Sequence, residues 1–396
     1  MSRARDLADY VSTGVTSTEL DKLDGLTATT DELNLVDGSV TGPLSHRNMI
    51  INGAMNVHQR GGTISYAHDG TASAYSLDRF KLYTSATDEW DGTVAQHTMS
   101  SADYNTTGFS KAFLLTTGTA ESAVANDENA SIWHLIEAQN LQHLQYGTAS
   151  AKSVTLSFWV KSSVTGTYAV GLYKPDSTSR VINKTIAISD TNWNKYTLTF
   201  PGDTDSGATI ANDNGAGIYV LWHLMSGSDF NDGANTSWEN YASAGWAGGH
   251  AQNGIITTAS ATFYLTGVQL ELGTVATPFE HKSYGDELAR CQRYFVIPTV
   301  SQYVGLAIGT SDGVRGNNCQ VSTPVTMRAA PTITSGTAHT LTFSQVYKST
   351  SSPTYSSIGA NGGGIKFNIG DLTSESTVDN QGLMLSFNDL KFTAEL

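Results

Sequence analysis

Short apolar runs alternate with turn residues from Asn48 to Glu280, and this pattern restricts the possible folds more than any other feature of the chain. The runs are rich in Val, Ile, Thr and aromatic residues and are bounded by Gly, Asn or Asp, which predicts β-strands separated by turns. Only 15% of all residues are charged, against about 25% in an average soluble protein. Because strands do not alternate regularly with helices, we expect an antiparallel β-sandwich. The clearest runs are 154–160, 168–173, 193–200, 218–222 and 262–272.

Two segments with helical spacing interrupt the β pattern. The segment 132–144 fits a helix by period, but its β context favours a strand that runs to Ile136 and is followed by one helical turn. In 284–295 the apolar residues are three to four apart, between an acidic start and a basic end, which predicts one short helix joining two domains. The residues after this helix return to β signals and predict a second, smaller sandwich.

Charge and composition exclude several partners and locations. The formal net charge is −14, and Lys and Arg nowhere form a stripe that would neutralise successive phosphates, so no nucleic acid is expected. No run reaches the roughly 20 apolar residues of a membrane helix, and the first residues lack the apolar centre of a secretory signal. We expect a chain that is not membrane-inserted and is made as a soluble cytoplasmic protein. Cys291 and Cys319 are expected to be free thiols.

The segments 18–25 and 31–38 repeat one pattern, in which a Glu precedes two apolar residues three apart and a closing Asp-Gly. Each copy predicts one capped helical turn, which is not stable alone because helices shorter than about 12 residues are marginal in water. Three chains around an axis would gather the apolar side chains into a shared core, which predicts a trimeric stalk. These side chains are Leu20, Leu23, Leu33 and Val36. The alternative is a flexible acidic leader whose self-similarity is accidental.

The two repeats resemble those in the tail fibres of marine bacteriophages, where such repeats form trimeric shafts. The segments 47–60, 153–161 and 267–280 together resemble the jelly-roll, carbohydrate-binding-module-like domain of many phage tail fibres. The segments 291–295 and 324–332 are similar to fibre C-terminal domains at the host-facing tip. The resemblance implies a homotrimeric structural protein of the virion tail, assembled in the host cytoplasm, that attaches to the host.

The resemblance also implies how a mainly β chain of this kind is divided. The parts are a virion-attachment peptide (1–13), a short-helix or coil trimeric stalk (14–45), a jelly-roll β-sandwich (46–282), a linker helix (283–296) and a smaller C-terminal β-sandwich at the tip (297–396). The expected partners are sister copies of the chain, a tail or other virion protein, and a host-surface glycan or outer-membrane component. The virion protein would be held by the attachment peptide through Arg3, Arg5, Leu7 and Tyr10.

A Gly-rich stretch, 223–253, holds aromatic residues amid amides and carboxylates. Sugar recognition uses flat aromatic faces for the apolar side of a pyranose and polar groups for its hydroxyls, and long loops in compact domains are often functional. The candidate sugar-binding residues are Trp238, Tyr241, Trp246, Asp229, Asn231 and Asn235. Alternatively, one or more of these tryptophans packs back onto the sandwich or across a trimer interface. In contrast, Trp159, Trp193 and Trp222 lie in strand-like runs and are expected in the core.

No cofactor is expected, and the sequence offers only a weak candidate for a bound cation. Asp203 and Asp205 have the alternating spacing of carboxylates that hold Ca²⁺, which takes six to eight oxygen ligands. The pattern does not continue into an EF-hand loop, because Asn214 stands where a glutamate would be needed. A solvated acidic turn is the alternative.

Several short catalytic motifs are absent from the sequence. It has no His-Glu-x-x-His, no Cys-x-x-Cys and no Gly followed by Lys, which excludes a P-loop. Acidic groups such as Asp88, Glu89 and Asp91 would suffice for a glycosidase only at a set separation. We therefore expect a host-binding tail fibre that is not an enzyme. The alternatives are a capsid-attached head fibre or decoration protein and a polysaccharide-depolymerising tailspike.

Overall fold

The computed structural model describes residues 46–67, 70–233 and 236–297, and then 307–309, 316–334, 339–343, 346–350, 354–361, 364–370, 383–387 and 391–396. All of these residues belong to the compact unit Pro43–Leu396. The predicted attachment peptide and stalk, with all the residues assigned to them, lie outside the described residues, as does Asn235. Both therefore stay predictions.

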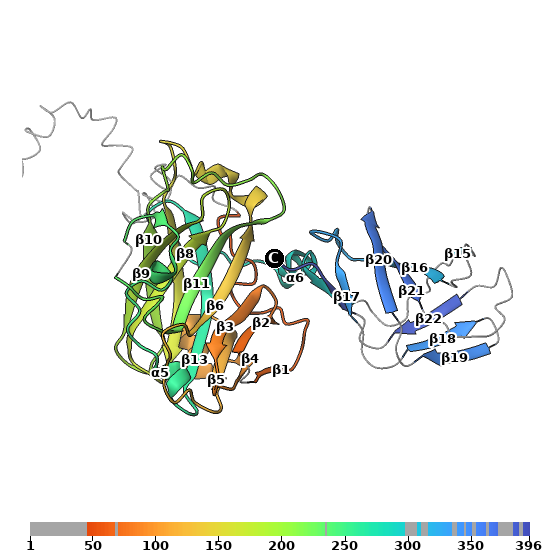
Figure 1. The fold of residues 1–396 in the computed structure, drawn as a ribbon, viewed down its shortest axis with the longest axis horizontal. Coiled ribbons are helices and arrows are strands. Elements are labelled where there is room, and N and C mark those ends of the chain that lie inside the picture. Colours follow the sequence, from red (N-terminus) through yellow and green to blue (C-terminus); the bar gives the residue numbers. More distant parts are fainter. Residues whose placement is uncertain are drawn as a thin grey trace, which may run out of the picture. The chain divides into compact units, whose positions relative to one another are not determined.

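The described part is mainly β, as predicted, and its largest component is a sandwich of two antiparallel sheets (Figure 1). In spatial order, the six-stranded sheet consists of β1 (Thr63–Tyr66), β4 (Gly92–Thr98), β5 (Lys111–Thr117), β13 (Thr262–Leu272), β7 (Val154–Ser162) and β10 (Asn194–Phe200). The seven-stranded sheet consists of β12 (Glu239–Asn240), β9 (Arg180–Ile188), β8 (Gly166–Lys174), β11 (Ala216–Ser226), β6 (Asn129–Glu137), β3 (Phe80–Thr87) and β2 (Gly70–Leu77). The predicted jelly-roll class of sandwich is confirmed.

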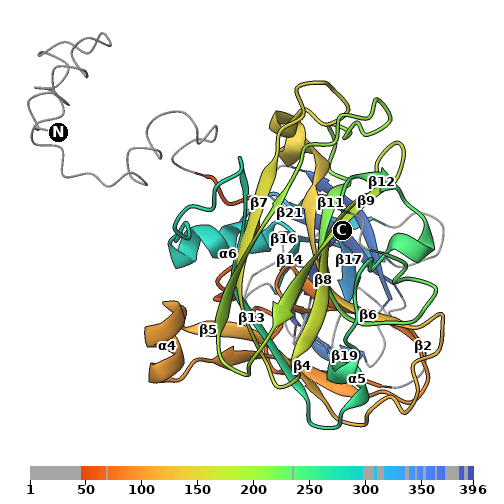
Figure 2. The same ribbon diagram turned by 90° about the vertical axis from the view of Figure 1, so that its left-hand side faces the viewer.

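Short helices connect the strands. Helix α4 (Ser101–Thr107) joins β4 to β5 (Figure 2). The segment predicted to be a strand and then one helical turn is β6 followed by the 3-10 helix η1 (Ala138–Leu144). The order of strand and helix is as predicted, whereas the helix is longer than one turn. The loop after β11 contains η2 (Ser243–Gly245) and α5 (Gly254–Thr257), and the predicted linker helix is α6 (Tyr284–Gln292). Among the described residues no helix is long and apolar enough to cross a membrane.

The described strands after α6 form three smaller antiparallel sheets. The first contains β14 (Phe295–Val296), β23 (Lys391–Thr393) and β17 (Thr332–Thr334), so the last strand of the chain pairs directly after the linker helix. The second contains β15 (Ala307–Gly309), β16 (Gly316–Ser322), β21 (Gly364–Gly370) and β20 (Thr354–Asn361). The third contains β19 (Val346–Thr350), β18 (His339–Phe343) and β22 (Leu383–Phe387).

The core lies between the two large sheets, and most of their strands contribute alternate residues to it, as the two-residue period of a strand requires. Trp222 of β11 is 1% exposed and its ring is 5.7 Å from that of Phe158 on β7, so its predicted core position is confirmed. Trp193 is also buried, at 7% exposed, but in a small separate cluster with Met99 and Ala112. Trp159 is only partly buried and packs against that cluster, because it faces the opposite side of β7 from the buried Phe158.

Candidate functional site

The outer face of the seven-stranded sheet carries an unusual number of aromatic side chains. On β11 the core receives Val220, Trp222 and Leu224, so Tyr219, Leu221 and His223 point to the opposite, outer face. Leu221 is directly opposite Trp133 of β6 in the strand register. The same alternation brings side chains of neighbouring strands together on this face.

Four of these side chains come from four neighbouring strands and, with a loop residue, form a continuous aromatic row. Ring centroids are 4.3 Å apart for Tyr83 and Trp133, 5.5 Å for Trp133 and Tyr219, and 5.3 Å for Tyr219 and Tyr173. Tyr241, in the loop after β11, continues the row 5.2 Å from Tyr173. Tyr219 and Tyr173 are directly opposite in register, whereas Tyr83 and Tyr219 are diagonal neighbours of Trp133.

The aromatic row is accessible along its length. Tyr241 is 40% exposed, and the four rings on the strands are half-buried. Burial raises the pKa of Tyr219 and of Tyr241, so both hydroxyls stay protonated at neutral pH and can donate hydrogen bonds. The Lys81 ammonium lies 4.7 Å from the centroid of the Trp133 ring, and desolvation lowers its pKa. The face thus combines flat apolar rings with a few polar donors.

Trp246 supports the row from beneath. It is 7% exposed and packs with Leu221 and Ala247. Its ring centroid is 5.2 Å from that of Tyr173 and 5.6 Å from that of Tyr241, in edge-to-face contacts. The indole of Trp246 therefore positions the ring of Tyr241, and little of the indole surface is left for a ligand.

Trp238 belongs to a different part of the sandwich. It is 9% exposed, its Nε1 donates to the Pro201 carbonyl oxygen at 2.7 Å, and its ring lies edge-to-face with that of Tyr146. The Arg180 guanidinium donates to the carbonyl oxygen of Trp238 and to Oδ1 of Asn240, which fixes this turn of the loop. Trp238 and Trp246 thus pack back onto the sandwich, which is the alternative that the sequence left open for them.

The candidate sugar-binding residues that the structure describes are therefore not gathered at one place. Tyr241 and Trp246 are in contact, whereas Trp238 packs elsewhere. Asp229 is exposed and Asn231 is half-buried. The residues that sequence reasoning missed are Tyr83, Trp133, Tyr173 and Tyr219, each an aromatic at an outward position of a strand whose inward positions are apolar. That alternation was the available signal.

The predicted cation candidate contains an ion pair. Asp203 is 2% exposed and accepts from Nε of Arg180 at 2.8 Å and from Nη2 at 3.1 Å. Asp205 lies 3.7 Å from the same guanidinium. A protein cation therefore already neutralises the Asp203 carboxylate, and the geometry favours the structural alternative for this turn.

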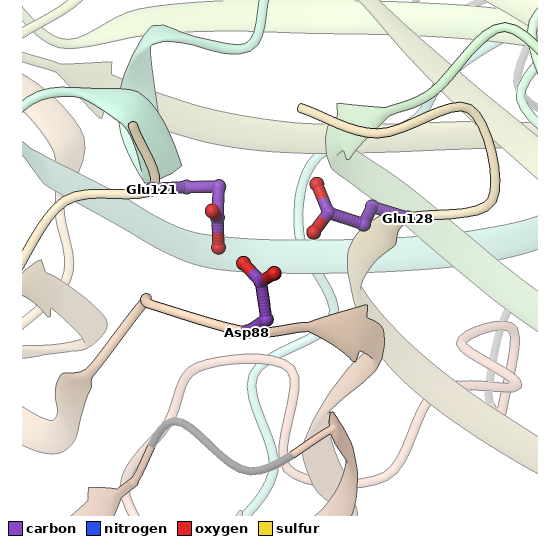
Figure 3. A group of neighbouring side chains, drawn as sticks. All are labelled: Asp88, Glu121 and Glu128. Atoms are coloured by element: carbon purple, nitrogen blue, oxygen red, sulfur yellow. The ribbon is translucent and has the colours of Figure 1, made fainter. Parts of the chain in front are cut away.

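A different group of acids has the separation that a divalent cation requires. The carboxylates of Asp88, Glu121 and Glu128 point toward one another, with oxygen atoms within 4.8 Å (Figure 3). Glu121 accepts from the backbone N–H groups of Glu89 and Trp90, and Glu128 accepts from that of Ala125. Hard cations such as Ca²⁺ bind carboxylate oxygens of this kind.

Burial raises the pKa of Glu121 and of Glu128, and the neighbouring acids raise both further. A carboxyl group whose pKa is raised in the folded state makes the protein less stable as the pH rises from the ordinary pKa of 4.5 through the raised pKa. We expect Glu128→Gln to raise the melting temperature at pH 7 by a few degrees, the effect of about 1 kcal/mol in a domain of this size, and to change it little at pH 4. Calorimetry at both pH values measures this.

The matched control is Asp127→Asn, which removes an exposed charge one residue away. It is expected to leave the melting temperature almost unchanged. A melting temperature for Glu128→Gln that is lower than that of the wild type at pH 7 would contradict the expectation. If a chelator abolished this difference between the two proteins, the result would indicate a bound cation.

No family model matches the sequence, and no curated protein matches it. Among solved structures, the chain is similar to the enzymatically active domain of tailspike protein 4 of bacteriophage CBA120, at 13% identity over 57% of this chain and a TM-score of 0.29. It spans only 21% of that tailspike chain.

The other similar structures include a family 11 carbohydrate-binding module from Clostridium thermocellum in complex with a mixed-linked tetrasaccharide. That match has 11% identity, a TM-score of 0.26 and coverage of 53% of this chain and 100% of the module. A putative sugar binding protein from Bacteroides thetaiotaomicron matches at 9% identity, with a TM-score of 0.29 and coverage of 57% and 100%.

Proposed function

We propose that this chain is the subunit of a trimeric phage tail fibre that recognises a glycan on the host surface without cleaving it, and that the aromatic row is the glycan-contacting surface. The observation that carries the proposal is the continuous row of partly exposed rings across β3, β6, β11 and β8. Contiguous exposed aromatic surface is uncommon on soluble proteins and usually marks a binding site.

The chemistry of the row suits a saccharide. Aromatic rings cover the apolar C–H face of a pyranose, while the hydroxyls of Tyr219 and Tyr241 and the Lys81 ammonium supply donors for its oxygen atoms. Neighbouring strands are about 4.8 Å apart, so four of them extend over roughly 15 Å. That length fits several sugar residues of an extended chain better than a single sugar.

The absence of cleavage is part of the proposal and has a structural argument in its support. The acids with raised pKa values, Glu121 and Glu128, are each 1% exposed, so a glycosidic bond cannot reach them in this conformation. Incubating the purified protein with host polysaccharide should release no reducing ends. New reducing ends would favour the tailspike alternative instead.

The fibre and virion parts of the proposal rest on the repeats at 18–25 and 31–38 and on the resemblance to tail fibres. We expect sedimentation to give a trimer and Leu20→Asp with Leu33→Asp to weaken it, because those leucines would line the shared core. Electron microscopy of virions labelled on this chain distinguishes a tail from a head location. A well-folded monomer at micromolar concentration would contradict the fibre assignment.

We expect Tyr241→Ala and Tyr83→Ala each to weaken binding to host cells or to purified host polysaccharide about tenfold, the effect of losing about 1.4 kcal/mol of ring contact. Titration at neutral pH measures this. The matched control is Tyr104→Ala, on α4, which removes a ring that is 51% exposed and lies outside the aromatic row. Unchanged affinity in both row variants would remove the row from the binding site.

A further inference from the structure

Two buried histidines meet beneath the loop that ends the aromatic row. His223, on the outer side of β11, is 0% exposed, and neither of its ring nitrogens has a hydrogen-bond partner. His250, in the loop, is 3% exposed, and the two imidazole centroids are 6.4 Å apart. We call residues 236–253 of this loop the strap. The strap therefore rests on the sheet through a pair of imidazoles.

His250 takes the place of a strand in the hydrogen bonding of β8. Pairing between β11 and β8 covers Tyr219 to Trp222 and Tyr173 to Val170. At the next residue of β8, the N–H of Ala169 donates to Nδ1 of His250 at 3.2 Å, and the N–H of Ala251 donates to the Thr167 carbonyl oxygen at 3.1 Å. Nδ1 accepts a hydrogen bond only in a neutral imidazole, because both nitrogens of an imidazolium are donors. Protonation of His250 consequently removes this bond.

The imidazole pair also supports the aromatic row. The ring centroid of Trp246 is 5.9 Å from that of His223, and Trp246 in turn contacts Tyr173 and Tyr241. The strap is held further by the bond from Nδ2 of Asn183 to the Gly245 carbonyl oxygen. Since Tyr241 is carried by the strap itself, a strap that leaves the sheet takes one end of the row with it.

Among the described residues, no carboxylate compensates a charge on either ring. On the side of β8, Tyr168 is the titratable contact, with a centroid 5.7 Å from that of His250. The neighbouring positions on β6 are Ser131 and Trp133, which carry no charge, and the ammonium of Lys81 on β3 lies over Trp133. The other polar neighbours of His250 are the main chain of Gln252 and the amide of Asn253. Asp229 and Asp232 of the same loop are exposed.

The electrostatics follow from this environment. Burial lowers the pKa of His250 to about 4, and burial together with the neighbouring His250 lowers the pKa of His223 well below its ordinary value of 6.5. Both rings are therefore neutral when the strap is closed, and in an open strap they would regain ordinary pKa values. The free energy that the neutral histidines contribute to closure of the strap is fully present above pH 6.5. It is lost as the pH falls from 6.5 toward 4.

We infer that His223 and His250 form an acid-sensitive latch, which holds the strap on the seven-stranded sheet at neutral pH and releases it when the pair is protonated. Release would displace Tyr241 and uncover Trp246, so glycan binding would weaken in acid. The effect on glycan binding rests on the function proposed above, whereas release of the strap does not. For each histidine, the open fraction increases up to about tenfold per pH unit below 6.5.

Hydrogen exchange of the full-length protein, read by mass spectrometry from pH 7.5 to 5 and corrected for intrinsic rates, tests the latch. We expect protection in peptides of 236–253 to fall by up to about a hundredfold per pH unit, with peptides of β7 and β13 unchanged. His134 is also buried, but it lies on β6 and faces the core beside Phe80. Its protonation would therefore change exchange in peptides of β6 and not in those of the strap. Protection in the strap that is independent of pH would overturn the inference.

His223→Leu separates the latch from general acid sensitivity. Because the ring of His223 makes no hydrogen bond, a leucine of similar volume is expected to fold and to halve the pH slope of strap exchange on a logarithmic scale. The control His143→Gln replaces an exposed histidine and should leave the slope unchanged. An unaltered slope in His223→Leu would contradict the latch.

Glycan binding at pH 7 and pH 5, measured on the same samples, distinguishes failure of the latch from failure of the proposed function. If the strap opens in acid while binding persists, the latch stands and the aromatic row is not the glycan site. If the strap stays closed, the latch is wrong, and the Tyr241→Ala result at neutral pH still decides the function.

Discussion

Glu395→Ala is expected to lower the free energy of unfolding by about 3–5 kcal/mol, because it leaves a buried arginine without its carboxylate. Arg79 is 0% exposed and forms an ion pair with Glu395, and its guanidinium carbon is 3.5 Å from the centroid of the Tyr294 ring. Arg60 holds the other oxygen of the same carboxylate at 2.7 Å. Burial opposes the charge on Arg79, but Glu395 outweighs it and keeps the pKa of Arg79 raised. Urea unfolding followed by tryptophan fluorescence measures the loss.

The double variant Arg79→Met with Glu395→Leu is the informative comparison, because it removes the fully buried charge of Arg79 together with its partner. It leaves unpaired only the charge of Arg60, whose side chain is 10% exposed. We expect it to be more stable than Glu395→Ala alone. Lys161→Ala serves as the control, since Lys161 and Asp103 form a more exposed pair, 34% and 22% accessible, whose loss should cost less than about 1 kcal/mol. A Glu395→Ala protein as stable as the control would show that the buried pair contributes little.

The ion pair also indicates how the end of the chain is attached. Glu395 follows β23, which pairs with β14 immediately after the linker helix. Arg328 donates to the carbonyl oxygens of Ala394 and Glu395, which fixes the same segment a second time. Loss of the Glu395 charge should therefore raise hydrogen exchange first in the peptide that contains β23.

Strand positions were predictable from the sequence because their signal is local. The run 262–272 is strand β13, and the run 154–160 lies within β7, since alternation of buried and exposed positions is written in consecutive residues. The linker helix was equally readable, from apolar spacing and an acidic first turn. The sequence alone therefore predicted the mainly β class.

Contacts between distant residues carried no such signal. Arg79 and Glu395 are 316 positions apart, and neither residue type nor local pattern connects them. The aromatic row depends in the same way on the register of four strands, because Trp133 and Tyr219 meet only when β6 and β11 pair as they do. Composition drew attention to the loop at 223–253, but burial of Trp238 and Trp246 depends on Pro201 and Leu221, which lie outside that loop or beneath it.

Trp238→Ala is expected to destabilise the sandwich by about 3–5 kcal/mol, whereas Tyr241→Ala should cost less than about 1 kcal/mol. The two aromatic residues are three positions apart, but Trp238 is 9% exposed and donates a hydrogen bond to Pro201, and Tyr241 is 40% exposed. Truncation of the indole leaves a cavity beside Tyr146 and an unsatisfied carbonyl oxygen, while truncation of the tyrosine mainly removes accessible surface. Thermal or urea unfolding of both variants measures the difference.

These two variants together separate packing from recognition within one loop. If Tyr241 contacts the glycan, its loss weakens binding in a protein of nearly wild-type stability. If Trp238 acts by packing, its loss weakens binding only as far as it unfolds the protein. Trp238→Phe keeps an aromatic ring beside Tyr146 and should therefore recover most of the stability and the binding. A Trp238→Ala protein that is fully stable and yet unable to bind would restore the indole to the glycan site, because only direct contact then explains the loss.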